Sequence, residues 1–176
     1  MKPKINQSKL KLAIVSTMLL GTAGFSTAGY ASQTTMVVTT SVAMACTVGA
    51  AALTFAAYDP TSSSDQESSA EITSNCTYGG SAKITINEGG AQAAGSTDAA
   101  PKRQMANTIV GDNSRLGYFL YQDSNRSVVL GNTVDTGKGF TAVQGDTITT
   151  VFAAIPKGQA ATYGSYTDTV LVTLTY

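Results

Sequence analysis

Catalytic chemistry has few residues to work with in this sequence. The chain contains no histidine and only two cysteines, and 12% of its residues are charged. Without histidine, the Ser–His and Cys–His arrangements that activate a nucleophile are excluded. We therefore predict that the protein is not an enzyme and that it needs no cofactor.

The two cysteines, Cys46 and Cys76, have the most specific chemistry in the chain. An even pair of cysteines in an exported chain favours a disulfide. Closing a loop of this length would stabilise the fold by about 3–4 kcal/mol. Metal binding is the alternative, but two thiolates without a histidine do not make up a zinc site.

The acidic residues are few and lie mostly in segments rich in turn-forming residues. Asp59, Asp65, Glu67 and Glu71 do not have the spacing of an EF-hand calcium loop. A solvated polar loop is the simpler interpretation. Spacing alone does not exclude a paired-carboxylate glycosidase, but the small number of charged residues argues against one.

The N-terminus has the pattern of a secretory signal peptide. Four lysines flank the start of an apolar stretch at residues 12–25, and small residues follow up to Ala31. The apolar stretch is too short to be a membrane anchor. Cleavage after Ala31 leaves 145 residues, with seven basic and eleven acidic side chains and a net charge of −4. We expect a single exported domain that does not bind nucleic acid.

Beyond the signal peptide, the sequence predicts strands and almost no helix. Strand-like runs occur at residues 36–46, 53–56, 70–78, 82–87, 117–122, 128–130, 147–155 and 166–176. Segments rich in Gly, Ser, Asp and Asn separate these runs and are typical of turns. Short strands joined by such turns favour an all-β sandwich.

The strongest strand signal covers residues 166–176. Apolar side chains fall on one face of this run, and threonines fall mostly on the other, with Leu171 as the exception. No further strand follows in the sequence to pair with it, and an open apolar edge is a template for another chain. We therefore expect a neighbouring segment to cover this edge.

A second alternating segment precedes Cys46, and together the two segments suggest an assembly. A sandwich that lacks its last strand has a groove, and an extended segment of another chain can fill that groove by strand addition. If one chain carries both the groove and the donor segment, the contact is heterologous and generates an open filament.

Several motifs match a known family: CTVG at residues 46–49, Cys76, RQM at 103–105, LGYFLYQD at 116–123, IPKGQ at 155–159 and GSYTDTVLVTLTY at 164–176. Through these motifs the sequence resembles the spore coat protein U domain family, and most closely the rod subunits of archaic chaperone–usher (Csu-type) pili. The resemblance extends from about Val37 onward. One departure is Leu130-Gly131, where many such domains carry an aromatic residue before the glycine.

The resemblance implies an incomplete immunoglobulin-like sandwich that lacks its final strand. A donor strand from a neighbouring subunit would complete it, and a Cys46–Cys76 disulfide would tie the first strand to the body of the sandwich. The donor residues would be Met36, Val38, Val42 and Met44. The acceptor groove would be lined by Val170, Val172, Leu174 and Tyr176.

This interpretation divides the chain into a signal peptide at residues 1–31, a donor segment at 32–45 and a pilin domain at 46–176. It implies a structural pilin that polymerises head to tail by donor-strand exchange, for surface attachment and biofilm formation. Its partners would be further copies of itself, a periplasmic chaperone, an outer-membrane usher, and adaptor or tip subunits. It would pass through the periplasm to a pilus on the cell surface.

Two alternatives remain open from the sequence. One is a non-fimbrial surface or spore-coat-type protein that uses the same domain. The other is the tip adhesin of the same pilus system. Tip proteins usually carry a second, receptor-binding domain, for which we expect 145 residues to leave no room.

Overall fold

The computed structural model describes residues 29–176, which contain strands and no helix. This confirms the all-β prediction. The predicted signal peptide lies almost entirely outside these residues. The strands are β1 Cys46–Ala50, β2 Gln66–Cys76, β3 Ser81–Ile86, β4 Arg103–Asn107, β5 Arg115–Tyr121, β6 Lys138–Thr141, β7 Asp146–Ile155, β8 Tyr166–Thr167 and β9 Val172–Thr175.

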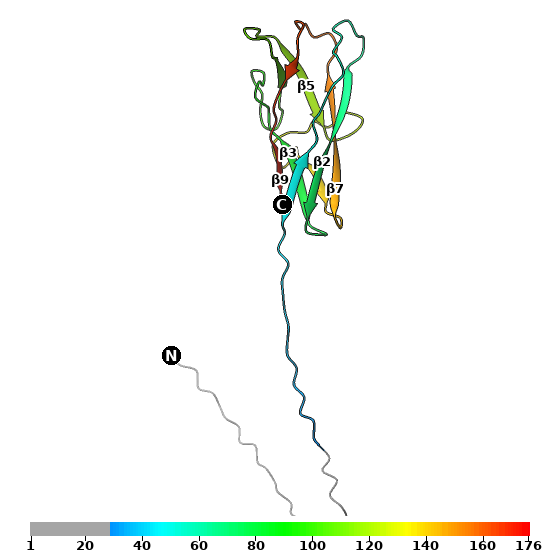
Figure 1. Cartoon of the computed structure of the whole chain (residues 1–176), viewed down its shortest axis with the longest axis vertical. Coiled ribbons are helices and arrows are strands. Elements are labelled where there is room, and N and C mark those ends of the chain that lie inside the picture. Colours follow the sequence, from blue (N-terminus) through cyan, green and yellow to red (C-terminus); the bar gives the residue numbers. More distant parts are fainter. Residues whose placement is uncertain (1–28) are drawn as a thin grey trace, which may run out of the picture. The chain divides into compact units, whose positions relative to one another are not determined.

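The strands form two antiparallel sheets (Figure 1). The larger sheet has the order β1-β2-β7-β5-β4-β8, and the smaller has the order β6-β3-β9. The last two strands therefore belong to different sheets, since β8 pairs with β4 and β9 pairs with β3. This arrangement is consistent with an incomplete immunoglobulin-like sandwich.

The core lies between the two sheets. Alternation places Ile84 and Ile86 of β3 against Ile72, Leu120 and Val151 of the larger sheet, and all five side chains are buried. Because successive side chains of a strand point to opposite faces, the intervening residues of β2 and β5 are more exposed. Burial of these apolar side chains is the main force that holds the sheets together.

A disulfide fastens the first strand to the second. Cys46 and Cys76 lie directly opposite each other in the β1–β2 ladder and are bonded, as the family resemblance implies. The two residues are separated by 30 positions in the sequence. Cross-linking at this separation stabilises the fold by about 3–4 kcal/mol, mainly by restricting the unfolded chain.

The structure differs from the sequence prediction where a segment has no ladder partner. Residues 36–45 and 53–56 form no strand, although their alternation predicts one. A strand is stabilised by pairing with its neighbour, so alternation alone does not produce it. The run at 128–130 is reduced to one isolated bridge, between Tyr121 and Val129.

Three strands were not expected from the sequence, and one expected run is divided into two strands. β1 shares only Cys46 with the predicted run at 36–46. Neither β4 nor β6 has an alternating apolar pattern long enough to predict a strand. The run at 166–176 is divided into β8 and β9 by residues 168–171. It divides because its two ends pair with different sheets.

Candidate functional site

An apolar groove runs between two segments that are far apart in the sequence. One wall is residues 50–58, which continue from β1 without forming a strand, and the other is residues 161–172. The groove consists of two adjoining hollows of about 440 and 790 Å³, which share Leu53, Phe55, Met105 and Tyr166. We refer to these two hollows together as the open groove.

Alternation positions the side chains on the first wall. Leu53 and Phe55 are half-buried and face the groove, whereas Ala52, Thr54 and Ala56 between and beside them are exposed. The wall is attached to β2 by the Ser68 side chain, whose hydroxyl donates to the carbonyl of Thr54 at 2.6 Å. This segment therefore has the side-chain pattern of a strand without its full ladder.

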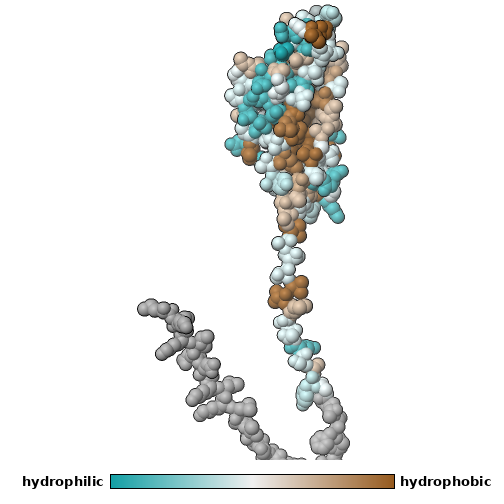
Figure 2. Space-filling view, turned by 60° about the vertical axis from the view of Figure 1, so that its left-hand side comes forward, coloured by the Kyte–Doolittle hydropathy of each residue, from teal (hydrophilic) through white to brown (hydrophobic). Residues whose placement is uncertain are grey.

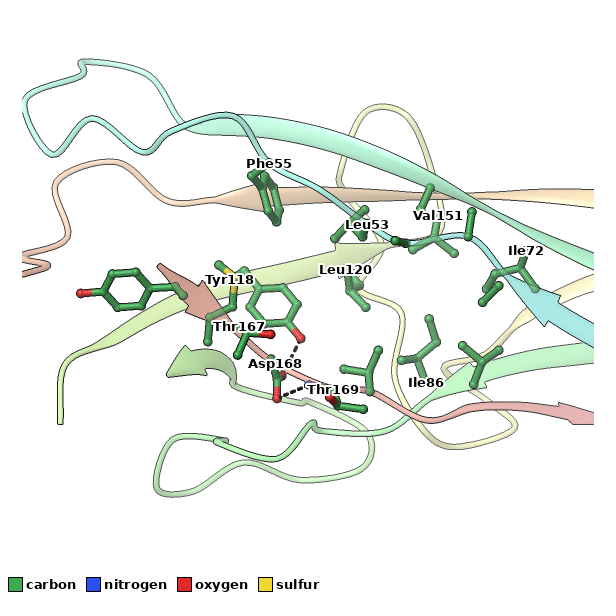
Figure 3. A pocket seen from close by; sticks show the side chains of 18 residues that line it. Leu53, Phe55, Ile72, Ile86, Tyr118, Leu120, Val151, Thr167, Asp168 and Thr169 are labelled. Atoms are coloured by element: carbon green, nitrogen blue, oxygen red, sulfur yellow. Dashed lines mark hydrogen bonds between the residues drawn. The ribbon is translucent and has the colours of Figure 1, made fainter. Parts of the chain in front are cut away.

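The floor of the groove is the sandwich core itself. Ile72, Ile86, Leu120 and Val151 line the hollow and converge on it from both sheets (Figure 3). In a complete sandwich such residues would be covered by a further strand. These four side chains are only 3% exposed, so an added apolar strand would mainly cover the half-buried side chains of the walls, which are Leu53, Phe55, Val170 and Val172.

The predicted acceptor residues lie along this groove and its continuation. Val170 and Val172 line the hollow, and Leu174 packs against the core beyond it. Tyr176 is exposed and borders a separate hollow with Phe140. Within residues 29–176, β9 pairs with β3 along one edge and with no strand along the other.

One polar side chain interrupts the apolar face of the C-terminal segment. Asp168 points into the groove, where its Oδ2 atom accepts a hydrogen bond from the Tyr118 hydroxyl at 2.7 Å (Figure 3). Its Oδ1 atom accepts from the backbone N–H of Gly90 at 2.8 Å. Burial, followed by this bond to Asp168, raises the pKa of Tyr118 well above its usual value of 10.0.

Arg103 is a second buried polar residue beneath the groove. Its Nε atom donates to the carbonyl of Asn87 at 2.8 Å, and its Nη2 atom donates to the carbonyl of Ile86 at 2.6 Å. Burial lowers the pKa of the guanidinium to about 10. These contacts satisfy carbonyl groups where β3 ends and so fix one edge of the groove floor.

The sequence predicted the apolar face of this site but not its polar part. Asp168, Tyr118 and Arg103 lie in motifs that carry the family resemblance, yet no structural role was expected for them. The signal that could have identified Asp168 is its even-numbered position, since a carboxylate there falls on an otherwise apolar face. Leu53 and Phe55 were also missed as groove residues.

The predicted donor residues are mostly uncovered. Met36 and Val38 belong to residues 29–40, which have no strand and are exposed throughout. In the domain from Ser41 onward, Val42 is 80% exposed, whereas Met44 is half-buried. Met44 lies so close to Gly80 that a Cβ atom there would meet its sulfur. Their role as a donor strand stays a prediction.

Residues 29–176 contain no group of three or more His, Cys, Asp or Glu side chains placed to hold a metal ion. No helix in this part of the chain is long and apolar enough to cross a membrane.

Comparison with known proteins identifies relatives of both sequence and fold. The family model of the Spore Coat Protein U domain matches residues 32–173. Protein U of Myxococcus xanthus is 36% identical over 141 residues, which cover 75% of this chain and 78% of that protein.

Solved structures with a similar fold include the CsuC–CsuE chaperone–tip adhesion subunit pre-assembly complex from the archaic chaperone–usher Csu pili of Acinetobacter baumannii. The match has a TM-score of 0.54 at 16% identity and covers 77% of this chain. This chain spans only 40% of the solved chain, so the likeness is one of fold. A chaperone–tip adhesin complex of CFA/I fimbriae biogenesis matches at a TM-score of 0.37 and 15% identity, over 71% of this chain and 38% of that one.

Proposed function

The chain belongs to the spore coat protein U domain family, and we propose that it is a structural pilin of a chaperone–usher pilus. Its activity is association: the segment at residues 32–45 of one copy enters the open groove of the next. The observation that carries the proposal is the open groove, which has an apolar floor and a β9 edge that no strand of residues 29–176 covers. Both are the features that strand addition requires.

The free energy gained by burying apolar donor side chains supports a long-lived contact between successive subunits. Each large apolar side chain that becomes fully buried contributes about 1.5–3 kcal/mol, so the four predicted donor side chains would contribute about 6–12 kcal/mol before ordering costs. Hydrogen bonds to the free edge of β9 add pairing and direction. An exposed segment without a strand of its own and a hollow apolar groove are thus complementary halves of one interface.

The partners that we propose follow from the surface of the subunit that each of them would cover. Before assembly, a periplasmic chaperone would shield the open groove, because an exposed apolar edge aggregates. An outer-membrane usher would then exchange the chaperone for the next subunit, with adaptor or tip subunits at one end. We propose export through the periplasm to a pilus on the cell surface, where it serves attachment and biofilm formation.

A surface-coat protein is the second candidate. It is favoured by the 36% identity to Protein U, which extends over 78% of that protein. In this role, the domain would form an amorphous layer and no fibres.

The first test is deletion of residues 32–40 in cells that also express the chaperone of the same system. Samples are run in SDS without boiling, because donor-strand joints would persist there as a ladder of multimers. We expect the deletion variant to remain bound to the chaperone and to form no ladder. A ladder equal to that of the full chain would contradict the proposal, and so would a stable free monomer.

A pair of adjacent substitutions provides the matched control. Val38 is predicted to face the groove, and Val37 is predicted to face away, and both are exposed valines in the present structure. Val38→Asp would place a charge against apolar residues and weaken the ladder strongly. Val37→Asp would leave the ladder unchanged. Equal effects from the two would argue against an alternating donor strand.

A further inference from the structure

Both ends of the domain carry exposed apolar side chains. At one end, residues 77–80 and 142–145 form two turns, from which Tyr78 and Val143 project. We call this the leader end, because Cys46 and Cys76 lie there. At the other end, residues 107–114 and 161–165 carry Ile109, Val110 and Tyr163, and we call it the far end.

The strand registers place these ends at opposite poles. In the β2–β7 ladder, Asn75 pairs with Asp146 at the leader end, whereas Gln66 pairs with Ile155 toward the far end. β5 joins β7 near Ala154 and begins beyond it, so the loop between β4 and β5 lies past the end of β7. Figure 2 shows a small hydrophobic patch at the top pole of the domain, and a larger hydrophobic area farther down the same face.

The apolar groups at each pole are held by hydrogen bonds. At the far end, the Asn107 side chain accepts from the N–H of Ile109 at 2.9 Å and donates to the carbonyl of Tyr163 at 3.2 Å. At the leader end, the N–H of Gly79 donates to the carbonyl of Ala142 at 3.0 Å. Both surfaces are therefore preorganised, which reduces the entropic cost of docking.

Hydrogen bonds hold the last residues before β1 against the domain. The Thr77 hydroxyl donates to the carbonyl of Ala43 and accepts from the N–H of Ala45, at 3.0 Å each. The N–H of Thr77 donates to the carbonyl of Ala45 at 2.9 Å. Val42 is the next residue outward and is free. One residue spans only about 3.4 Å, so a groove that receives Val42 must lie directly against the leader end.

The donor segment has two ways to lie in the groove of the next copy. If it left that groove at the leader end, it would meet the receiving copy's own residues 43–45, which are already fixed there. Leaving at the far end avoids this clash. A donor segment that leaves at the far end also runs antiparallel to β9. Antiparallel pairs of strands are slightly more stable than parallel pairs.

We propose that the leader end of one copy docks on the far end of the next, with Tyr78 and Val143 packed against Ile109, Val110 and Tyr163. This proposal rests on the donor-strand function proposed above and adds a second contact to it. The contact is small, so it fixes the angle between successive copies and contributes little to affinity. Met44, which lies over Gly80 of its own copy, then belongs to this junction. The junction therefore shortens the predicted donor set to Met36, Val38 and Val42 and keeps Met44 outside the groove.

Cysteine cross-linking tests the junction in assembled protein. Tyr78→Cys and Val110→Cys are introduced together, since these side chains are 76% and 100% exposed. A short bismaleimide is added to assembled material, where Cys46 and Cys76 are bonded to each other and do not react. Boiling in SDS then removes non-covalent joints. We expect a ladder of covalent multimers.

The controls separate the junction from the donor-strand function. Tyr78→Cys with Val128→Cys should give no covalent ladder, because Val128 is exposed on the loop after β5, away from the far end. An unboiled ladder without covalent multimers from the Tyr78–Val110 pair would overturn the junction alone. If the parent chain gives no unboiled ladder, the donor-strand proposal fails and the junction fails with it. Dimers from Tyr78→Cys alone would indicate two leader ends in contact and would overturn the orientation.

Fibre shape offers a second measurement. Val110→Asp should leave the unboiled ladder unchanged but make the fibres bend more, which lowers their persistence length in electron micrographs. Val128→Asp is the matched control and should leave the persistence length unchanged. Equal persistence lengths for the parent chain and Val110→Asp would overturn a junction that sets the angle.

Discussion

Ile84 and Leu174 are paired in the same ladder, yet they belong to two different environments. Ile84 of β3 is 0% exposed, whereas Leu174 of β9 remains half-exposed. Both fall on the inward face of an alternating strand. The difference arises because β3 has a strand on each side, whereas within residues 29–176 β9 has one on a single side. Apolar patterning thus marks the face that needs covering, and topology decides whether it is covered.

The two halves of the sandwich should therefore respond differently to the same kind of change. In the closed half, stability depends only on the chain itself. Along the open groove, part of the stabilisation appears only when a donor strand is present.

The largest effect is expected from Val172→Asp, measured as the amount of chaperone-bound or laddered protein. Val172 lines the groove, so the substitution would place a charge beneath the donor strand and abolish stable complexes. Leu171→Asp is the matched control, because the side chain of Leu171 is 64% exposed on the opposite face. Normal assembly by Val172→Asp would show that the groove is not the acceptor.

A smaller effect is expected for truncation of the paired residues. Ile84→Ala should lower the free energy of unfolding by about 2–5 kcal/mol, whether or not a donor is bound, because it creates a cavity in a closed core. Leu174→Ala should cost less in the free domain and more once a peptide of residues 32–45 is bound. Denaturant unfolding with and without this peptide measures both. Equal costs for Leu174→Ala in the two states would remove the distinction between the halves.

The Tyr118–Asp168 contact should give the domain a pH dependence above about pH 10. The pKa of Tyr118 is raised in the folded state, mainly by burial. Above its usual value of 10.0, the unfolded chain loses this proton while the folded chain keeps it. Stability contributed by Tyr118 is therefore present below pH 10 and is lost as the pH rises further.

Comparison with Tyr118→Phe tests this contribution. Arg103 acts in the opposite sense, because burial lowers its pKa to about 10, and the Tyr118 charge raises that pKa. The substitution removes this charge as well, so the comparison measures the coupled pair of Tyr118 and Arg103. The parent chain should lose more stability than Tyr118→Phe between pH 9 and 11, as followed by denaturant unfolding. Parallel curves would mean that Tyr118 is not shielded in the folded domain.

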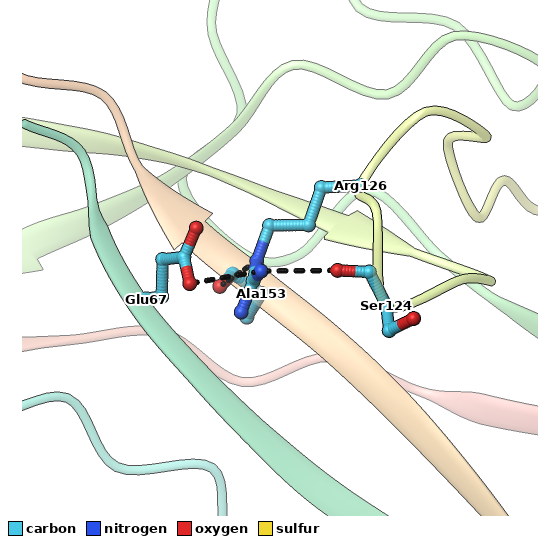
Figure 4. A network of polar contacts seen from close by, with 4 residues as sticks. All are labelled: Glu67, Ser124, Arg126 and Ala153. Atoms are coloured by element: carbon cyan, nitrogen blue, oxygen red, sulfur yellow. Dashed lines mark hydrogen bonds and ion pairs between the residues drawn. The ribbon is translucent and has the colours of Figure 1, made fainter.

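The smallest effect is expected on the outer face of the closed half. The Arg126 guanidinium lies 2.9 Å from the Glu67 carboxylate and also donates to the carbonyls of Ser124 and Ala153 (Figure 4). Because the Glu67 side chain is exposed, Glu67→Gln should cost at most about 1 kcal/mol. A much larger loss in thermal or denaturant unfolding would show that this ion pair is part of the core framework.

The sequence by itself determined the strand class and the inward faces of β3 and β9, and it favoured a bond between the two cysteines. These follow from local rules, since alternation fixes which side chains share a face. It did not determine that residues 53–58 would lack a ladder or that the run at 166–176 would divide between two sheets. Those outcomes depend on which strands are neighbours, and no local pattern encodes that.

Only the tertiary structure revealed the polar parts of the site. Asp168 meets Tyr118 across 50 residues of sequence, and Arg103 reaches the carbonyl of Ile86 across 17. Buried polar groups must find hydrogen-bond partners, but which partner each group finds depends on the packed geometry. The apolar face of residues 170–176 was thus readable from alternation, whereas the other wall of the groove, its hydrogen bonds and the two poles of the domain were decided by folding.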